Sequence, residues 1–570
     1  DRYINDALVS DRALREIYLK GFEIIVKESQ PWTIMSSYNK VNGTYVAENP
    51  EYLTGILRDE WGFEGLVMSD WFGGNDAPAM VRAGNDLLEP GTKQQWDALI
   101  EAHENGELSE ADINTAVRRI LRLVVDSRKM GGYTFGNDPD LEAHAAVTRQ
   151  SAAEGAVLLK NEGVLPLQES QTIALIGVTS YEFIAGGTGS GDVNEAYTVS
   201  LEQGLTNAAS QSSIKSMAPE PLTNHTVFEI AETPKEAFEA HKEANAEAFV
   251  KPEGMNAMFQ PYDPPEFLLT PQQLEQAVEE ADVAIITIGR NSGEGGDRVE
   301  KDDFLLSQKE KELISSTCEA FHAAGKKVIV VLNIGGVIET ASWKQQPDAI
   351  LLAWQGGQEG GNSVADILSG SVNPSGKLPM TFPINLEDHA SHANFPLEGK
   401  PMEMTDMLSR EEKPDNEKVR NQDYTEYKEG IYVGYRHFDK ADLQVSYPFG
   451  YGLSYTEFDF GTMEATLEDT GIQVRVAVTN TGDTAGKEVV QVYSSKPGTS
   501  IDRPVRELRA FSKTRLLQPG ETEELIFNIP VADLRYWDEG KSGWTLEAGT
   551  YTIEMGASSR DLRQKAAIDL

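Results

Sequence analysis

The sequence predicts an α/β protein that ends in a β-sandwich, and three patterns support this. Near the N-terminus, short apolar stretches at 32–37 and 65–69 flank a helical stretch at 48–60, which is the spacing of a βαβ unit with parallel strands. Between residues 147 and 353, continuous apolar stretches alternate with helical ones, as in a parallel sheet covered on both faces. Towards the C-terminus, short strands separated by Pro-Gly and Ala-Gly turns indicate a β-sandwich.

Composition limits the classes of function. The 570 residues carry a formal net charge of −41, which disfavours nucleic acid as a partner because its phosphates would be repelled. No apolar run approaches the ~18 residues that a membrane span needs, so we expect no membrane partner. The single cysteine, Cys318, excludes an intrachain disulfide framework and is interpreted as a small core residue. No CxxC motif or histidine-rich cluster is present, so no metal site is predicted.

The first predicted domain, 1–140, contains three helices with good capping residues. Ser10 or Asp11 begins the first helix, Asn49 and Pro50 begin the second, and Ser109 begins the third. Their predicted apolar faces are Leu14, Ile17, Tyr18, Phe22 and Ile25; then Leu53, Ile56 and Leu57; then Ile113, Val117, Ile120, Leu121 and Val124.

Two polar side chains come directly after the strands of this domain. Tyr38 follows the stretch 32–37 and Asp70 follows 65–69, and ligands bind at the carboxyl ends of parallel strands. An aspartate after a strand is most often a turn cap. Trp71, however, is a large ring that suits a solvent-facing loop only if something stacks on it. A carboxylate beside an aromatic platform is what a pyranose ring needs.

The second predicted domain, 146–385, opens with a helix at 147–159. Its predicted strands are 173–177, 283–289, 327–333 and 349–353, and its predicted helices include 270–280 and 305–324. The acidic stretch 205–265 is interpreted as an insertion that the sheet does not require. A linker, 386–428, and a β-sandwich domain, 429–570, complete the predicted organisation.

Two glycine-rich loops stand out in this second domain. The loop 185–192 has neither the Walker A spacing nor GxGxxG, which argues against a phosphate site. The loop 290–298 follows a parallel strand and holds Glu294 between glycines, where the backbone can present a side chain at a tip. A solvated turn is the usual fate of such a loop, but its place at a strand's carboxyl end favours a functional carboxylate.

These motifs together resemble glycoside hydrolase family 3, and in particular its bacterial β-glucosidases, over nearly the whole chain. The resemblance implies the C-terminal part of a (β/α)8 barrel, then an α/β sandwich, then a fibronectin type III-like domain. It assigns the catalytic nucleophile to Asp70 and the general acid/base to Glu294. It also assigns sugar contacts to Tyr38, Trp71 and Ser190, and to Arg2, the arginine that closes the family's upstream Lys-His stretch. Arg298 and Asp297 are expected to pair or to brace the loop.

The implied activity is retaining, exo-acting hydrolysis of terminal non-reducing β-D-glucosyl residues, without metal or organic cofactor. Two carboxyl groups ~5–5.5 Å apart would perform it, and because they come from different domains we expect an interdomain cleft. The expected partner is a small-molecule or oligosaccharide β-glucoside; the oligomeric state is left open. A β-xylosidase, another exo-glycosidase, or an inactive chain that keeps only its sugar-binding surface are the alternatives.

A complete (β/α)8 barrel takes ~250 residues and eight strands. Before residue 140 only three strand ends are convincing, at Tyr38, Asp70 and Asp86. We therefore expect activity to depend on a first barrel half supplied from elsewhere, and the apolar helix faces of residues 1–140 to be open to water without it.

Overall fold

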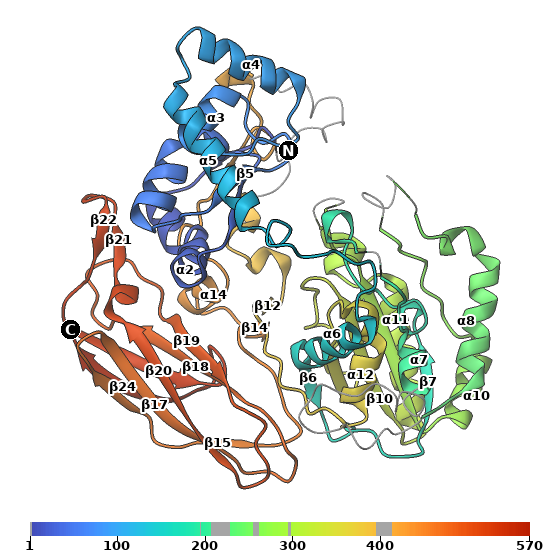
Figure 1. The fold of residues 1–570 in the computed structure, drawn as a ribbon. Coiled ribbons are helices and arrows are strands. Elements are labelled where there is room, and N and C mark those ends of the chain that lie inside the picture. Colours follow the sequence, from blue (N-terminus) through green and yellow to red (C-terminus); the bar gives the residue numbers. More distant parts are fainter. Residues whose placement is uncertain are drawn as a thin grey trace. The chain divides into compact units, whose positions relative to one another are not determined.

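The computed structural model describes residues 3–193, 195–206, 228–252, 254, 261–294, 298–394 and 413–570. These form two compact units, and Figure 1 labels many of their helices and strands. Unit 1 comprises Asp1–Pro139, Ala390–Val433 and Arg535–Glu547. Unit 2 comprises Asp140–His389, Gly434–Leu534 and Ala548–Leu570.

The predicted βαβ unit is present in unit 1. Strands β2 (Thr33–Ser36) and β5 (Leu66–Ser69) pair in parallel, with Ser36 opposite Ser69. The crossover helix, Glu51–Glu60, has Leu53, Ile56 and Leu57 on its buried face, as predicted. Asn49 begins it, because its Oδ1 accepts the backbone N–H of Glu51. The third strand is a single parallel bridge from Met68 to Leu87.

The first helical stretch differs from the prediction in the face that it buries. It runs through α1 (Asp11–Ala13), a π-helical segment (Leu14–Tyr18) and α2 (Lys20–Ser29), and Ser10 caps it. Leu14 and Val26 are buried, whereas Phe22 and Ile25 are 48% and 51% exposed. The prediction for Phe22 and Ile25 is wrong because a π-helical segment has more residues per turn, which rotates the following face relative to a 3.6-residue periodicity.

The remaining helices of unit 1 are α3 (Ala77–Ala83), α4 (Lys93–Glu104) and α5 (Glu110–Asp126). Ser109 caps α5 as predicted. The predicted apolar face of α5 is present but not buried: Val117, Leu121 and Val124 are 43%, 55% and 46% exposed. The described strands of residues 1–140 therefore leave the apolar face of α5 exposed to solvent.

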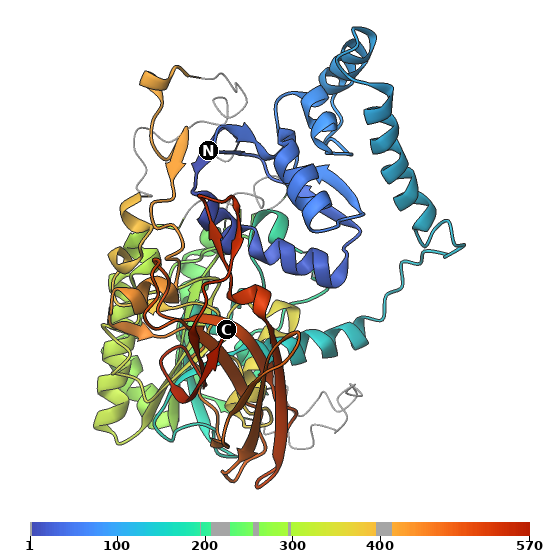
Figure 2. The same ribbon diagram turned by 90° about the vertical axis from the view of Figure 1, so that its left-hand side faces the viewer.

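Segments from the C-terminal half complete unit 1. Strand β13 (Tyr424–Glu426) pairs in parallel with β1 (Asp6–Leu8), so the stretch predicted as an irregular linker, 386–428, contributes a strand. The hairpin β21 (Tyr536–Asp538) and β22 (Gly543–Thr545) also belongs to unit 1, and Figure 2 shows it beside the N-terminal helices. There, the Arg15 guanidinium lies 4.3 Å from the centre of the Trp537 ring. The predicted domain boundaries stay predictions.

Unit 2 is built on a six-stranded sheet in the order β6-β11-β10-β9-β7-β8. All neighbours are parallel except β6, which is antiparallel to β11. The strands are β6 (Val157–Asn161), β7 (Thr172–Ile176), β8 (Glu229–Ile230), β9 (Val283–Arg290), β10 (Lys327–Ile334) and β11 (Ala349–Leu352). The four strands predicted for this domain are confirmed. The helix predicted at 147–159 ends earlier, because residues 157–159 are fully buried in β6.

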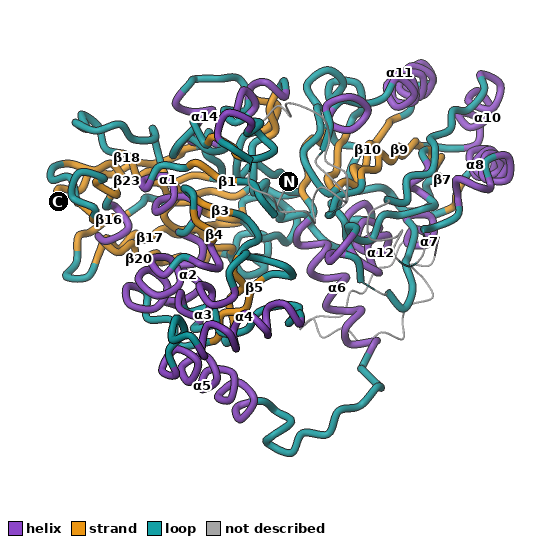
Figure 3. Tube along the Cα trace, turned by 90° about the horizontal axis from the view of Figure 1, so that it is seen from above, coloured by secondary structure: helices purple, strands orange, loops and turns teal. Residues whose placement is uncertain are grey.

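Helices cover both faces of this sheet, as Figure 3 shows. Alternate residues of β7 divide between two cores: Ile173 and Leu175 face one side, Ala174 and Ile176 the other. Helices α10 (Pro271–Glu280) and α11 (Gln308–Ala323) pack on one face. Helices α6 (Leu141–Gly155), α7 (Leu201–Thr206) and α12 (Gly360–Leu368) pack on the other.

The stretch 205–265 is less separate from the sheet than predicted, in the part that the structure describes. Strand β8 extends the sheet beside β7, and α8 (Glu232–Ala244) follows it. Phe238 of α8 is 2% exposed and stacks on Tyr181, with ring centres 4.3 Å apart. Both elements therefore contribute to the core of unit 2.

The C-terminal part of unit 2 is a sandwich of two antiparallel sheets. One sheet contains β15 (Phe458–Phe460), β16 (Glu464–Leu467), β17 (Gly471–Asn480) and β20 (Thr522–Pro530); the other contains β18 (Val489–Ser495), β19 (Glu507–Lys513), β23 (Thr550–Gly556) and β24 (Leu562–Asp569). Alternation along β17 buries Ile472, Val474, Val476 and Val478 between the sheets.

Three properties of the described residues bear on function class. Cys318 is 4% exposed in α11, and burial raises its pKa to about 12, which fits the predicted core residue. Among these residues, no group of three or more His, Cys, Asp or Glu side chains is placed to hold a metal ion. Nor do they include a helix both long and apolar enough to cross a bilayer.

Candidate active site

Asp70 lies at the carboxyl end of β5, and its loop is held at several points. The Asp70 N–H donates to the Ser36 carbonyl at the end of β2 (3.0 Å), and the Asp70 carbonyl accepts the Gly73 N–H (2.9 Å). The Trp71 N–H donates to Asp70 Oδ1 (2.7 Å), which fixes the orientation of the carboxylate. The residue predicted as nucleophile is thus held by backbone hydrogen bonds from the neighbouring strand and the following turn, and its carboxylate by the Trp71 N–H.

Glu48 fixes the far end of the same loop. Its Oε1 accepts the backbone N–H groups of Asn75 and Asp76, the latter at 2.8 Å. The Phe72 N–H donates to the Glu89 carbonyl (3.1 Å). Sequence reasoning missed Glu48, and no motif marks it: a glutamate before Asn-Pro gives no sign that it reaches a loop 27 positions later.

Aromatic side chains stand near this strand end. Trp71 is 59% exposed and makes an edge contact with Phe72, with ring centres 6.4 Å apart and ring planes at 69°. Tyr38, which follows β2, packs against Tyr3 with ring centres 4.7 Å apart. An exposed indole directly after the carboxylate is available for stacking, and its contact with a sugar stays a prediction.

The third predicted strand end has a structural role instead. Asp86 is 5% exposed, and its two oxygens accept from Arg58 (2.9 Å) and Arg119 (2.8 Å). Its Oδ2 also accepts the Val67 N–H (3.0 Å). A carboxylate with these partners binds the crossover helix and α5 to β5.

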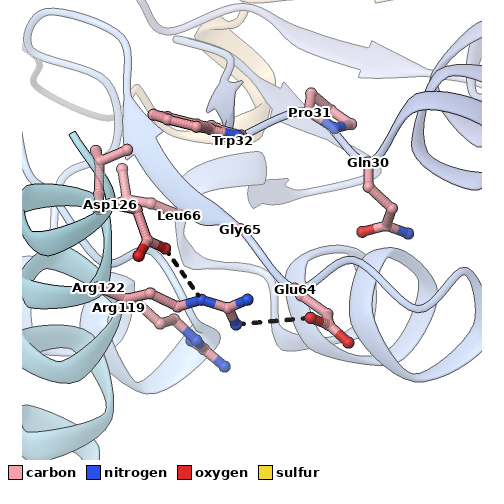
Figure 4. Close-up of a pocket in the computed structure, with 10 residues that line it drawn as sticks. Gln30, Pro31, Trp32, Glu64, Gly65, Leu66, Arg119, Arg122 and Asp126 are labelled. Carbon is pink, nitrogen blue, oxygen red and sulfur yellow. Dashed lines mark ion pairs between the residues drawn. The ribbon is translucent and has the colours of Figure 1, made fainter. Parts of the chain in front are cut away.

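Figure 4 shows a pocket of about 390 Å³ at the opposite ends of the same strands. Trp32 and Gly65, which precede β2 and β5, line it together with α5 residues. Arg122 spans it, with ion pairs to Glu64 (3.5 Å) and Asp126 (3.7 Å). None of the predicted site residues lines this pocket, so it carries no catalytic assignment.

In unit 2, the two glycine-rich loops meet. Thr188 and Gly293 form a parallel bridge, the Thr188 N–H donates to the Ser292 carbonyl (2.8 Å), and the Glu294 N–H donates to the Thr188 carbonyl (3.4 Å). The Ser190 N–H then donates to Glu294 Oε2 (2.6 Å). Two residues predicted to act on a sugar, Ser190 and Glu294, are therefore direct neighbours.

Glycine is required at three positions of this contact. A Cβ at Gly187 would lie 2.8 Å from the Ser292 carbonyl oxygen, and one at Gly189 would lie 2.5 Å from both Cβ and Oε2 of Glu294. At Gly293, with φ of +138°, a Cβ would lie 2.3 Å from the Thr188 nitrogen. The glycines noted in the sequence thus permit two backbones to approach each other.

Ion pairs brace the loop 290–298 at both ends. Arg290, the last residue of β9, makes a two-pronged ion pair with Glu310 of α11, and Arg298 pairs with Asp303. Arg298 also donates to the Val337 carbonyl (2.8 Å). Arg298 braces the loop as expected, with Asp303 as its partner. Asp297 and Arg2 lie outside the described residues.

Comparisons with known proteins find a matching family model for each of three parts of the chain. Residues 5–123 match the glycosyl hydrolase family 3 N terminal domain, 156–435 its C-terminal domain, and 488–559 a fibronectin type III-like domain. The three matches follow one another along the chain in the order predicted from the sequence.

Curated relatives and solved structures agree with this match. The thermostable beta-glucosidase B of Acetivibrio thermocellus is 32% identical over 99% of this chain and 66% of its own length. An exo-alpha-(1->6)-L-arabinopyranosidase of Bifidobacterium breve is 33% identical over 100% of this chain and 67% of its own. The structure of beta-glucosidase 3B from Thermotoga neapolitana with alpha-D-glucose superposes with a TM-score of 0.87 at 41% identity, covering 100% of this chain and 75% of that one. The chain belongs to glycosyl hydrolase family 3.

Proposed function

We propose that this protein is a retaining, exo-acting β-glucosidase that removes terminal non-reducing β-D-glucosyl residues. The observation that carries the proposal is Asp70, held by backbone hydrogen bonds at the carboxyl end of β5 and followed by the exposed ring of Trp71. Relatives named beta-glucosidases, at 32% identity or above over nearly the whole chain, support the choice of glucose.

The proposed chemistry assigns one step to each carboxyl group. Asp70 attacks the anomeric carbon, while Glu294 gives its proton to the departing glycosidic oxygen, and a glycosyl-enzyme forms. Glu294, now a carboxylate, takes a proton from water, which attacks the same carbon and releases the sugar and Asp70. The C–H face of the sugar stacks on Trp71, and Tyr38 binds its hydroxyls. Ser190 and Arg2 are further proposed sugar contacts.

A second candidate is an α-L-arabinopyranosidase, because a relative of that name is 33% identical over the whole chain. The two candidates differ in the sugar that the same carboxylates act on, so one assay separates them.

The experiment is a panel of nitrophenyl glycosides of equal leaving group. The proposal expects the highest kcat/KM on the β-D-glucoside. A highest value on the α-L-arabinopyranoside selects the second candidate, and a highest value on the β-D-xyloside contradicts both. Asp70→Asn serves as the control, since activity that remains in this variant does not come from the proposed site.

A further inference from the structure

We propose that the glycine-rich loop 185–192 is the element that positions Glu294 for proton transfer, through the backbone N–H of Ser190. This deepens the proposed function and rests on it. The loop acts here through its backbone, and its residues Gly189 and Ser190 are positioning residues in that role.

The contact between the loops fixes both the backbone and the carboxyl group of Glu294. The bridge between Thr188 and Gly293 fixes the backbone directly before Glu294. The Ser190 N–H then holds Oε2 of Glu294 at 2.6 Å. A hydrogen bond to one oxygen fixes the rotation of the carboxyl group, and so the direction in which the other oxygen faces. Proton transfer depends on that direction because donor and acceptor must lie within hydrogen-bond reach.

The glycine-rich loop can impose this geometry because its own base is anchored in the sheet. Asn333 of β10, which is fully buried, accepts the Ile184 N–H (2.7 Å) and donates to the Ile184 carbonyl (3.0 Å). The Gly357 N–H donates to the Ala185 carbonyl (2.9 Å). The opposite loop is anchored as well, since the Ser292 hydroxyl donates to Gln355 (3.0 Å).

The sequence supplies two matched pairs of variants. Ser190→Pro removes the N–H that holds Glu294, whereas Ser190→Ala keeps it. Gly189→Ala places a methyl group 2.5 Å from the Glu294 carboxyl, whereas Gly191→Ala, two residues away, meets nothing within 4 Å. The second pair tests the same contact if the proline variant fails to fold.

The readout is the ratio of kcat/KM on an aryl β-glucoside with a good leaving group to kcat/KM on one with a poor leaving group, because kcat/KM reports the step that forms the glycosyl-enzyme and not its hydrolysis. A good leaving group needs no proton, so in that step a misplaced acid slows only the poor one. We expect Ser190→Pro and Gly189→Ala to raise this ratio by about 10- to 100-fold, since a displacement of ~1 Å costs on the order of 100-fold. Azide, which needs no general base, should accelerate both variants. Gly191→Ala should keep the wild-type ratio, and Ser190→Ala, which keeps the N–H but loses the hydroxyl proposed to contact the sugar, measures how much of the change in Ser190→Pro comes from that hydroxyl.

A second readout does not depend on activity. In Glu294→Ala the amide of Ser190 loses its acceptor, so we expect its hydrogen exchange to accelerate by at least 10-fold while amides of β9 stay protected. Unchanged leaving-group ratios in Ser190→Pro and Gly189→Ala, or unchanged exchange at Ser190, would overturn the inference. A wild-type protein that hydrolyses no glycoside while Ser190 exchange responds as expected would instead count against the proposed function alone.

Discussion

Replacing Glu310 by alanine should destabilise unit 2 through Arg290, the residue at the base of the acid/base loop. The two side chains are 10% and 8% exposed, and Arg290 Nη2 lies 2.8 Å from Glu310 Oε2. Removing Glu310 leaves Arg290 with the more distant Asp303 (3.9 Å) as its remaining ion-pair partner, so the cost should approach but not exceed about 3–5 kcal/mol, the cost of a fully broken buried pair. Glu310 also accepts the Ser307 N–H at the start of α11, a capping contact worth ~1 kcal/mol.

Hydrogen exchange at β9 and β10 measures this cost where it arises, because the chain has two units and a single unfolding midpoint is not well defined. At 1.36 kcal/mol per tenfold, 3–5 kcal/mol corresponds to about 10²- to 10⁴-fold faster exchange of those amides. The control is Glu312→Ala, an exposed glutamate on the same helix, for which we expect less than about 0.5 kcal/mol. Equal exchange in Glu310→Ala and Glu312→Ala would refute the reasoning.

Three further predictions concern the site and its surroundings. Asp70→Asn should abolish turnover with a near-native melting curve, and wild-type kcat in this variant would contradict the nucleophile assignment. Trp71→Ala should raise KM for glucosides about 10-fold or more if the ring stacks on the sugar as proposed, while changing stability by less than about 0.5 kcal/mol, because the ring is 59% exposed and not part of the core. Burial raises the pKa of Glu266 to about 7; the nearby Glu310 also raises this pKa, and the nearby Lys309 lowers it. The folded state therefore binds the extra proton, so the contribution of Glu266 to the stability of unit 2 should fall as pH rises from about 4.5 to about 7. Glu266→Gln should remove that slope in the opening free energies of β9 and β10 amides, measured by hydrogen exchange across this range.

The elements that the sequence predicted best are those in which local pattern and tertiary burial agree. The crossover helix at 51–60 is itself π-helical, yet its cap at Asn49 and its buried face of Leu53, Ile56 and Leu57 were both predictable from the sequence. The strands of unit 2 were equally predictable, since they are continuous apolar runs buried on both faces of the sheet.

The failures have identifiable physical causes. A π-helical segment at 14–18 changed which face of the first helix is buried, and a 3.6-residue pattern does not reveal it. The strand at 424–426 is short and polar, and only its pairing with β1 makes it a strand. Likewise, no local pattern shows that Tyr536–Asp538 packs on helices more than 500 positions away, because such contacts depend on the whole fold.

The site was predicted in part. The strand-end position of Asp70 and the exposure of Trp71 follow from sequence pattern and loop chemistry. The contact of Ser190 with Glu294 could not be predicted from the sequence. It joins two positions 104 residues apart through a backbone N–H, and nearly every residue type has such a donor. The glycines at 187, 189 and 293 were the available sign, since each marks a close approach of two backbones.

Trapping the glycosyl-enzyme tests the central claim most directly. A 2-deoxy-2-fluoro β-D-glucoside with a good leaving group forms the covalent intermediate but releases it slowly, because fluorine destabilises the positively charged transition state. Proteolysis and mass spectrometry then locate the bound sugar. We expect a fluoroglucosyl group on Asp70, absent from Asp70→Asn. A label on any other residue, or none in a preparation that hydrolyses glucosides, would contradict it.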